Sequence, residues 1–322
     1  MSQSALCPRS DGARYLKRSR CMQAPVRTIL AATDLSRAAF AALRRAALIA
    51  RAHGAALEVV HVVPAPPRSA AWDELRAAFS GVETDLRRSV AENLDAIVAQ
   101  IESETGVRAR TTMLDGKAFE QVAAHSDATG ADVIVVGAHG ENLTTPLLGT
   151  TAHRVLRLAR TPVLLVKRTP AVDHAATPGY GHIVVATDFS SDSARAATTA
   201  QRLFPESSIT LLHVFEAPFE AKLAARVPQT TLDAYRQRAF DEAHRELESF
   251  AASVGLSDAP RLVRHGSPSI RIREYASDTS ADLIAVGTAD VPRLQQALLG
   301  SVSLDVVTQA ECDVLLARTA AS

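Results

Sequence analysis

One internal repeat constrains the fold of this chain more than any other feature. Four segments recur in the same order: RTILAATDLS (27–36) returns as HIVVATDFS (182–190), LEVVHVV (57–63) as ITLLHVF (209–215), ADVIVVG (131–137) as ADLIAVG (281–287), and TPVLLVKR (161–168) as CDVLLAR (312–318). Four matches at nearly constant spacing indicate one domain present twice. The 322 residues accommodate two domains of ordinary size.

The repeat also predicts the domain boundaries. The first copy is expected over residues 25–168 and the second over 182–319. Between them, TPAVDHAATPGYG (169–181) has two prolines, two glycines and no apolar period, so it is interpreted as a linker. Residues 1–24 are basic and lack the apolar stretch of a secretory signal, which predicts a disordered tail. An alternative is that Met22 is the true start.

Helical patterns alternate with apolar strands in each copy. Ser36 is a plausible N-cap, the following helix has one apolar face, and Gly54 supplies a C-terminal stop. Arg37, Arg44 and Arg51 fall on another face of this helix, expected to be solvated. A second apolar stripe, ending before Gly106, comprises Leu75, Phe79, Val82, Leu86, Val90, Leu94, Ile97 and Ile101, and it returns more loosely as Leu247, Phe250 and Val254 before Gly255.

The strands are continuous Val, Ile and Leu runs rather than alternating ones, so both faces of the sheet must be covered. Helices between strands imply parallel pairing. The sequence therefore predicts an α/β protein with two tandem, open-twisted, five-stranded parallel-sheet domains of Rossmann-like type.

Ligands of such sheets bind at the carboxyl ends of the strands. There, VIVVGAHGENLTTPLLGTT (133–151) runs from a strand into Gly137, Gly140 and then Gly149 with two threonines. Glycine-rich turns bring backbone N–H groups close to phosphate oxygens, and a helix start adds its positive end. The stretch is interpreted as an anion site, most simply for a nucleotide's phosphates. The alternative is a turn that only lets strand and helix pack closely.

With these residues in view, the chain resembles a tandem universal stress protein over residues 26–168 and 181–318. In nucleotide-binding members, strand four ends in Gly, two residues, Gly, nine residues, then Gly-Ser or Gly-Thr. The first copy matches with Gly137, Gly140 and Gly149-Thr150, although its spacer from Glu141 to Leu148 has eight residues. The second copy has Gly287 and Gly300-Ser301, but Asp290 replaces the second glycine. The first copy is thus expected to be the better pocket.

The resemblance implies an adenine-nucleotide site in each copy. Asp34 and Asp188 would lie beside the nucleoside or its metal, Val62 and Val214 would meet the adenine, and Val136 and Val286 would line the base pocket. The full set of expected contacts is Ala32, Asp34, Val62, Val136, Gly137, Gly140, Gly149, Thr150 and Thr151 in the first copy, and Ala186, Asp188, Val214, Val286, Gly287, Gly300, Ser301 and Val302 in the second. The implied ligand is ATP, with or without bound Mg²⁺, and AMP and ADP are alternatives.

The turn after the third strand differs between the copies. The family's Gly-x-Pro element survives as Gly266-Ser267-Pro268 in the second copy, whereas the first has Gly116-Lys117-Ala118.

Several of these residues have simpler interpretations. Asp34 and Asp188 could be turn or cap residues. His61 and His213 are expected to be packed core histidines, and His139 either touches a phosphate or lies in solvent. Cys312 is expected to be buried and unreactive.

Three functional hypotheses follow from different classes. The favoured one is a nucleotide-binding stress-response regulator, the second an interaction protein with degenerate pockets, and the third a slow ATP hydrolase. No catalytic residue or metal site is predicted, because the phosphate-loop, zinc and nucleophile-elbow motifs are missing from the sequence.

Partners and location follow from composition. Thirty-five basic against thirty-five acidic residues give no net field for nucleic acid or a membrane surface, and no apolar run approaches membrane length. Three scattered cysteines favour the cytoplasm. The resemblance implies that Val163–Val166 and Val314–Leu316 pair the two domains as an intramolecular pseudo-dimer, with a homodimer left open.

Overall fold

The computed structural model describes residues 24–65, 74, 81–138, 148–167, 179–217, 220, 226–288 and 299–319. The first copy contains β1 (Thr28–Thr33), α1 (Arg37–His53), β2 (Ala56–Val63), α3 (Val82–Thr105), β3 (Ala109–Asp115), α4 (Ala118–Thr129), β4 (Val133–Gly137), α5 (Thr150–Leu158) and β5 (Val163–Val166). The second contains β6 (His182–Ala186), α6 (Ser191–Leu203), β7 (Ser208–Phe215), α8 (Gln229–Ser253), β8 (Arg261–His265), α9 (Pro268–Asp278), β9 (Leu283–Gly287), α10 (Ser301–Gln309) and β10 (Asp313–Ala317).

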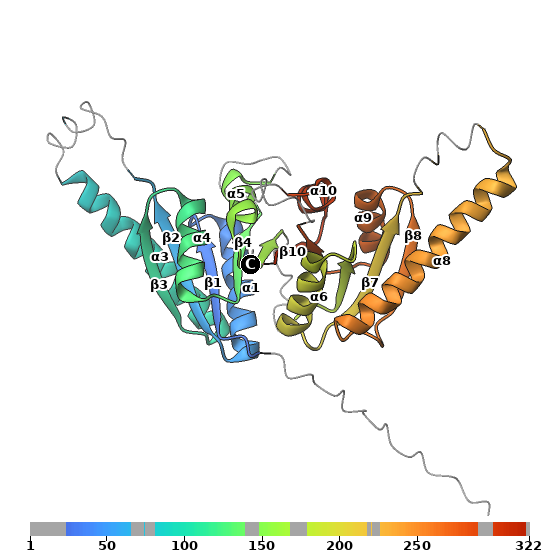
Figure 1. Cartoon of the computed structure of the whole chain (residues 1–322). Coiled ribbons are helices and arrows are strands. Elements are labelled where there is room, and N and C mark those ends of the chain that lie inside the picture. The colour runs from blue at the N-terminus through green and yellow to red at the C-terminus, as the bar shows by residue number, and fades with distance from the viewer. Residues whose placement is uncertain are drawn as a thin grey trace, which may run out of the picture.

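All ten of these strands form a single sheet. Its order is β3-β2-β1-β4-β5-β10-β9-β6-β7-β8, so each copy contributes five strands. Pairing is parallel within each copy, which confirms the predicted fold class. Across the middle, β5 and β10 pair antiparallel, with Leu165 opposite Val314 and Val163 opposite Leu316. The two copies consequently lie side by side, with α3 and α8 at opposite outer ends (Figure 1).

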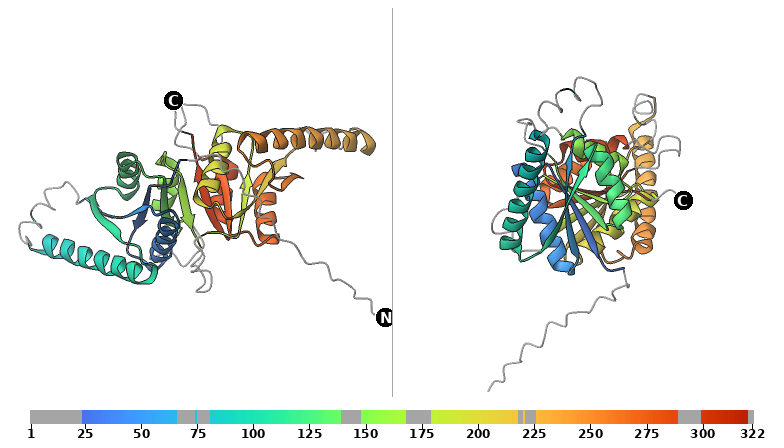
Figure 2. Two further views of the ribbon diagram at one scale, coloured as in Figure 1. Left: turned by 90° about the horizontal axis from the view of Figure 1, so that it is seen from below. Right: turned by 90° about the vertical axis from the view of Figure 1, so that its left-hand side faces the viewer.

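Helices cover both faces of the sheet. Side chains from α1, α3, α6 and α8, such as Leu43, Leu94, Ala200 and Leu247, share one buried cluster. Side chains from α4, α5, α9 and α10, such as Val122, Val155, Ile272 and Val306, share the other. Figure 2 shows these layers from two further directions. Coverage on both sides explains why the strands are apolar throughout rather than alternating.

Local signals at α1 are confirmed. The Ser36 Oγ accepts a hydrogen bond from the Ala39 N–H at 3.1 Å, and Gly54 ends the helix with φ +61°, where glycine is favoured. Of the two arginines on the predicted solvated face whose side chains are described, Arg51 is exposed, as predicted, and donates to the Thr105 carbonyl at 3.4 Å. Arg44 is only half-exposed, because it pairs with Glu104 near the end of α3 at 3.3 Å.

The apolar stripe of α3 is buried only in its second half. Leu94 and Ile101 are 1% exposed, but Leu86 is 60% exposed. The helix has 24 residues and spans about 36 Å, whereas the 7 residues of β3 span about 23 Å. The first turns of α3 therefore extend past the sheet, as Figure 1 shows. Leu75 and Phe79 lie outside the described residues.

Polar contacts cross the junction between the copies. Arg202 of α6 donates to Asp132 at 2.8 Å, and the His53 Nε2 lies 2.8 Å from the Leu203 carbonyl oxygen. The backbone N–H of Lys167, after β5, donates to the buried Asp313 carboxylate of β10 at 2.8 Å. None of these contacts was predictable from the repeat, because each joins the two copies.

Candidate functional site

The predicted pocket side chains gather on one face of the sheet. In the first copy, Val62 and Val136 belong to the cluster that packs against α4 and α5, and Ala32 packs on its edge. In the second copy, Ala186, Val214 and Val286 take the matching places against α9 and α10, and Val302 of α10 packs on the edge of the cluster. The sheet thus brings these apolar side chains of each copy together on one face, whereas Asp34, Gly137 and Gly149 are not among the residues that line the hollow described below.

Of the predicted phosphate-binding stretch 133–151, the structure describes residues 133–138 and 148–151. The Gly149 N–H donates to the Ala138 carbonyl at 2.8 Å, so the start of α5 lies directly beside the end of β4. In the second copy the Gly300 N–H donates to the Thr288 carbonyl at 2.9 Å in the same way. Gly140, His139 and Asp290 lie outside the described residues.

A hollow of about 430 Å³ lies over these strand ends in the first copy. Three chain segments line it: the residues after β2, the turn between β3 and α4, and the first turn of α5. Its lining residues are Pro64, Ala65, Gly116, Lys117, Ala118, Phe119, Thr150, Thr151 and Arg154. Thr150 and Thr151 were predicted as ligand contacts; the others were not.

The electrostatics of this hollow favour an anion. Both α4 and α5 begin at it, and neither has a side-chain cap on its first N–H groups. Uncapped helix starts present N–H donors and the positive end of the helix dipole. Lys117 and Arg154 add two cations to the lining. Burial, and then the nearby Arg157 and Arg154, lower the pKa of His153 on α5.

The two cations of the hollow are held differently. Lys117 Nζ lies 2.9 Å from the Glu120 carboxylate in an exposed ion pair, which has little stability of its own. The Arg154 guanidinium lies over the Phe119 ring, 5.0 Å from its centroid. This stacking positions the guanidinium at the hollow. An anion could engage both cations from the hollow, with apolar Pro64, Ala65 and Ala118 beside it.

Asp34 and Asp188 make the turn contacts that their simpler interpretation predicted. The Asp34 Oδ1 accepts from the Ser36 N–H at 3.0 Å, and the Asp188 Oδ1 accepts from the Ser190 N–H at 3.1 Å. The middle residue of each turn, Leu35 or Phe189, has a positive φ, of +67° and +66° respectively. Both carboxylates are exposed at the carboxyl ends of β1 and β6, so the turn does not preclude contact with a ligand.

His61 and His213 are engaged by the protein. The Nδ1 atoms lie 2.9 and 2.8 Å from the carbonyl oxygens of Thr33 and Thr187 respectively. Burial lowers the pKa of His213, whose ring also stacks on Phe189 at 4.3 Å. These contacts fit the packed-histidine expectation. Cys312 is buried, as expected.

Gly287 serves close packing. A Cβ atom placed there would lie 2.5 Å from the Ser193 backbone nitrogen and 2.7 Å from the Asp192 carbonyl carbon. The end of β9 therefore requires glycine wherever α6 packs against it, with or without a ligand. At this position the packing alternative to a phosphate turn accounts for the residue.

Asp192 is a buried acid that sequence reasoning missed. It is 4% exposed and accepts hydrogen bonds from the Thr288 hydroxyl and, at 2.6 Å each, from the Thr319 N–H and hydroxyl. The network ties the start of α6 to the ends of β9 and β10. The repeat places Ala38 and Ala138 at the corresponding positions of the first copy, so only a comparison of the copies could have drawn attention to Asp192.

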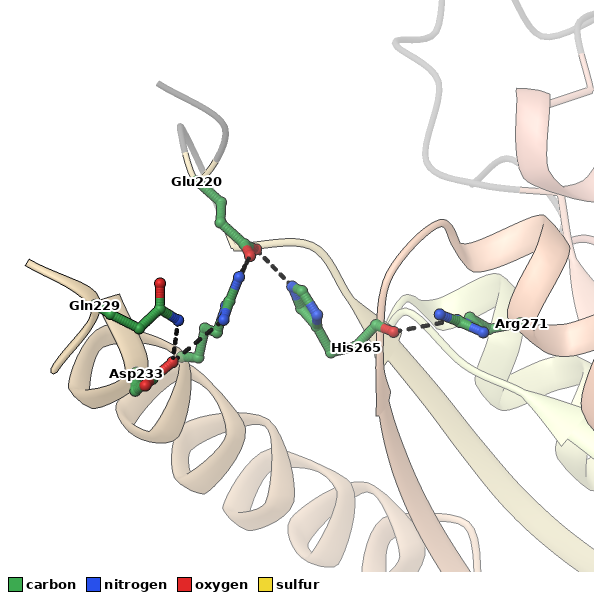
Figure 3. Close-up of polar contacts among 6 residues, drawn as sticks. Glu220, Gln229, Asp233, His265 and Arg271 are labelled. Atoms are coloured by element: carbon green, nitrogen blue, oxygen red, sulfur yellow. Dashed lines mark hydrogen bonds and ion pairs between the residues drawn. The ribbon is translucent and has the colours of Figure 1, made fainter. Parts of the chain in front are cut away.

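A second hollow, of about 310 Å³, lies beneath α8 and is lined by Phe215, Asp233, Arg236, Gln237, Phe240 and His265. None of the predicted ligand residues lines it. Figure 3 shows its polar contacts: Glu220 accepts from the Arg236 Nε at 2.7 Å and from the His265 Nε2 at 2.6 Å. Burial raises the pKa of Glu220, but these hydrogen bonds lower it more, and the net shift is downward. Arg236 and His265 thus already have a carboxylate partner.

Two further properties bear on function. Among the described residues, no group of three or more His, Cys, Asp or Glu side chains could hold a metal ion. Within the same ranges, no helix has both the length and the apolar character needed to cross a membrane.

Comparisons with known proteins agree with the architecture. The model of the Universal stress protein family matches residues 25–167 and again residues 179–318. A Staphylococcus aureus (strain USA300) protein assigned to the universal stress proteins is 29% identical over 146 residues, covering 44% of this chain and 85% of its own.

Two solved structures share the fold over most of the chain. The crystal structure of a universal stress protein from Archaeoglobus fulgidus covers 91% of this chain and 98% of its own, with a TM-score of 0.61 and 19% identity. A functionally unknown protein from Pseudomonas aeruginosa PAO1 covers 91% of this chain and 93% of its own, with a TM-score of 0.57 and 20% identity. Since the family model matches both repeats, the chain belongs to the universal stress protein family and carries its domain twice.

Proposed function

We propose that this universal stress protein binds an adenine nucleotide, ATP in the first instance, in the hollow of its first copy. The observation that carries the proposal is the convergence of two uncapped helix starts, those of α4 and α5, on one hollow of about 430 Å³. Helix starts of this kind bind phosphate through backbone N–H groups. Thr150 and Thr151 add hydroxyl groups at the same point.

The hollow also has room and apolar surface for the rest of a nucleotide. Ligand pockets of about 300–1,000 Å³ hold small molecules, and this one lies within that range. Pro64, Ala65 and Ala118 supply apolar contacts for a base. Asp34, exposed at the end of β1, is within the same strand-end region and would contact the ribose or a nucleotide-bound Mg²⁺. AMP and ADP are alternative ligands.

The proposed role is regulatory rather than fast catalysis. Asp34 is the acid that the family resemblance assigns to the ligand in the first copy, and its Oδ1 is already committed to the turn with Ser36. A general base needs to reach an attacking water beside the terminal phosphate. Slow ATP hydrolysis is the enzymatic alternative, and measurement of phosphate release tests it below.

The pairing of β5 with β10 supports a further part of the proposal. Apolar edge strands require cover, and each copy covers the other's edge here. We propose that the two domains, residues 25–168 and 182–319, act as an intramolecular pseudo-dimer in the cytoplasm. In this arrangement ATP in the first copy would alter contacts made with partner proteins.

Equilibrium dialysis with radiolabelled ATP tests the proposal. The wild-type chain is expected to bind ATP, and Gly140→Leu is expected to abolish binding by blocking close approach of the backbone. Gly81→Leu is the matched control, since a Cβ at Gly81 meets open space and Gly81 does not line the hollow. Absence of binding to the wild type would favour the interaction-protein alternative. Steady-state phosphate release above the control without protein would favour the hydrolase.

A further inference from the structure

The two copies differ in charge at equivalent positions around the proposed site. Arg154 is the residue four positions beyond the start of α5, and Asp305 is four positions beyond the start of α10. Lys117 follows the glycine of the turn after β3, and Ser267 follows the glycine after β8. Both cations of the first hollow are thus replaced in the second copy, one of them by an acid.

Further exchanges point the same way. Pro64 follows β2, but the exposed Glu216 follows β7. Ala118 begins α4 and has a backbone N–H, whereas Pro268 begins α9 and has none. An anion at the second copy would therefore lose a donor and meet two carboxylates where the first copy offers lysine, arginine and proline. Carboxylates close to a bound phosphate repel it and so weaken its binding.

The arginines of the second copy do not reverse this difference. Arg273 lies 3.4 Å from Asp305, and Arg271 lies 2.8 Å from Glu274, so each has an acidic partner. The Arg264 guanidinium lies over the Tyr275 ring at 5.2 Å. In the first copy, Arg154 itself occupies the place that Asp305 has in the second, and it stacks on the Phe119 ring.

Resting on the proposed function, we infer that the chain binds one nucleotide rather than two, and that Arg154 and Lys117 contact its phosphates. These two cations would strengthen the binding of ATP, which has phosphates, but not that of adenosine, which has none. Hydrogen bonds to charged groups contribute enough for loss of Arg154 to weaken ATP binding by about tenfold or more. The second copy then serves as a partner domain without nucleotide.

Titration of the nucleotide-free chain with ATP, followed by competition with adenosine, tests this inference. We expect one ATP per chain. Arg154→Asp, which installs the acid of the second copy, and Lys117→Ser should each weaken ATP binding by about tenfold or more, while adenosine affinity changes by less than about threefold. Arg160→Asp is the control, because it makes the same charge change on an exposed residue outside the hollow and should leave ATP affinity within about twofold.

The outcomes separate this inference from the function on which it rests. Two ATP per chain, or unchanged ATP affinity in Arg154→Asp, would overturn the inference and leave ATP binding itself intact. Equal weakening by Arg154→Asp and Arg160→Asp would also overturn it, since bulk charge would then explain the effect. No ATP binding by the wild type would overturn both. Thermal unfolding midpoints equal to wild type establish that each variant is folded.

Discussion

Arg154 and Asp305 occupy the same place in the two copies of one fold, and they carry opposite charges. Each lies on the first turns of the helix that begins beside the fourth strand of its copy. The two copies thus share one backbone arrangement but carry different charges at this position. This difference, together with the lysine at 117, is why the first copy is the proposed nucleotide site.

The half-buried Lys167 predicts a pH dependence of stability. Its Nζ donates to the Ala310 carbonyl at 2.6 Å, and burial lowers its pKa from 10.5 to about 8. Because the folded pKa is lower than the unfolded one, the folded state binds fewer protons between these values, and stability rises with pH there. Relative to Lys167→Met, the wild type should gain up to about 3 kcal/mol between pH 8 and pH 10.5. Urea denaturation of both proteins at each pH measures this, and parallel pH profiles would refute it.

Asp132 predicts sensitivity to acid at the junction between the copies. Burial raises its pKa, but hydrogen bonds from the Arg27 and Thr28 N–H groups and the charge of Arg202 lower it more. The folded pKa is below the unfolded one, so this stabilisation is present at neutral pH and is lost as pH falls through the folded pKa. Asp132→Asn should lower the thermal midpoint at pH 7 and have less effect near pH 2. An equal effect at both pH values would contradict the assignment.

Asp192→Ala is expected to destabilise the second copy. The substitution leaves the Thr288 hydroxyl and both Thr319 donors without their acceptor. The free energy of unfolding should fall by about 2–4 kcal/mol in urea denaturation. Asp278→Ala, an exposed acid at the end of α9, is the control and should change it by less than about 0.5 kcal/mol. Similar losses in the two variants would refute the network's importance.

Gly287→Ala separates packing from ligand binding. The new Cβ would lie 2.5 Å from the Ser193 backbone nitrogen, so either β9 or α6 must move. We expect a loss of stability of about 3 kcal/mol, measured by urea denaturation. ATP binding by the folded fraction should be unchanged, because the proposed site is in the first copy. Wild-type stability combined with weaker ATP binding would instead make Gly287 a ligand residue.

Much of the fold could be predicted because its determinants are local. The apolar strands, the Ser36 cap and the Gly54 stop each depend on a few neighbouring residues. The exposed Leu86 could not be predicted, because helical periodicity does not reveal that β3 is shorter than α3. Periodicity predicts which face is apolar, and the length of the partner strand decides whether that face is covered.

The candidate site was predicted only in part for a related reason. Thr150 follows the glycine motif directly, so it was expected at the ligand. Lys117 and Arg154 lie far apart in sequence and meet only because α4 and α5 start at the same edge of the sheet. Asp192 likewise depends on the pairing of β10 with β9, which brings Thr319 to α6.

A crystal structure of the chain grown with excess ATP tests the central claim most directly. The account predicts one nucleotide per chain, with its phosphates at Thr150 and the start of α4 and with Arg154 and Lys117 in contact with phosphate oxygens. An empty hollow in the first copy, or ATP bound in the second copy instead, would contradict it.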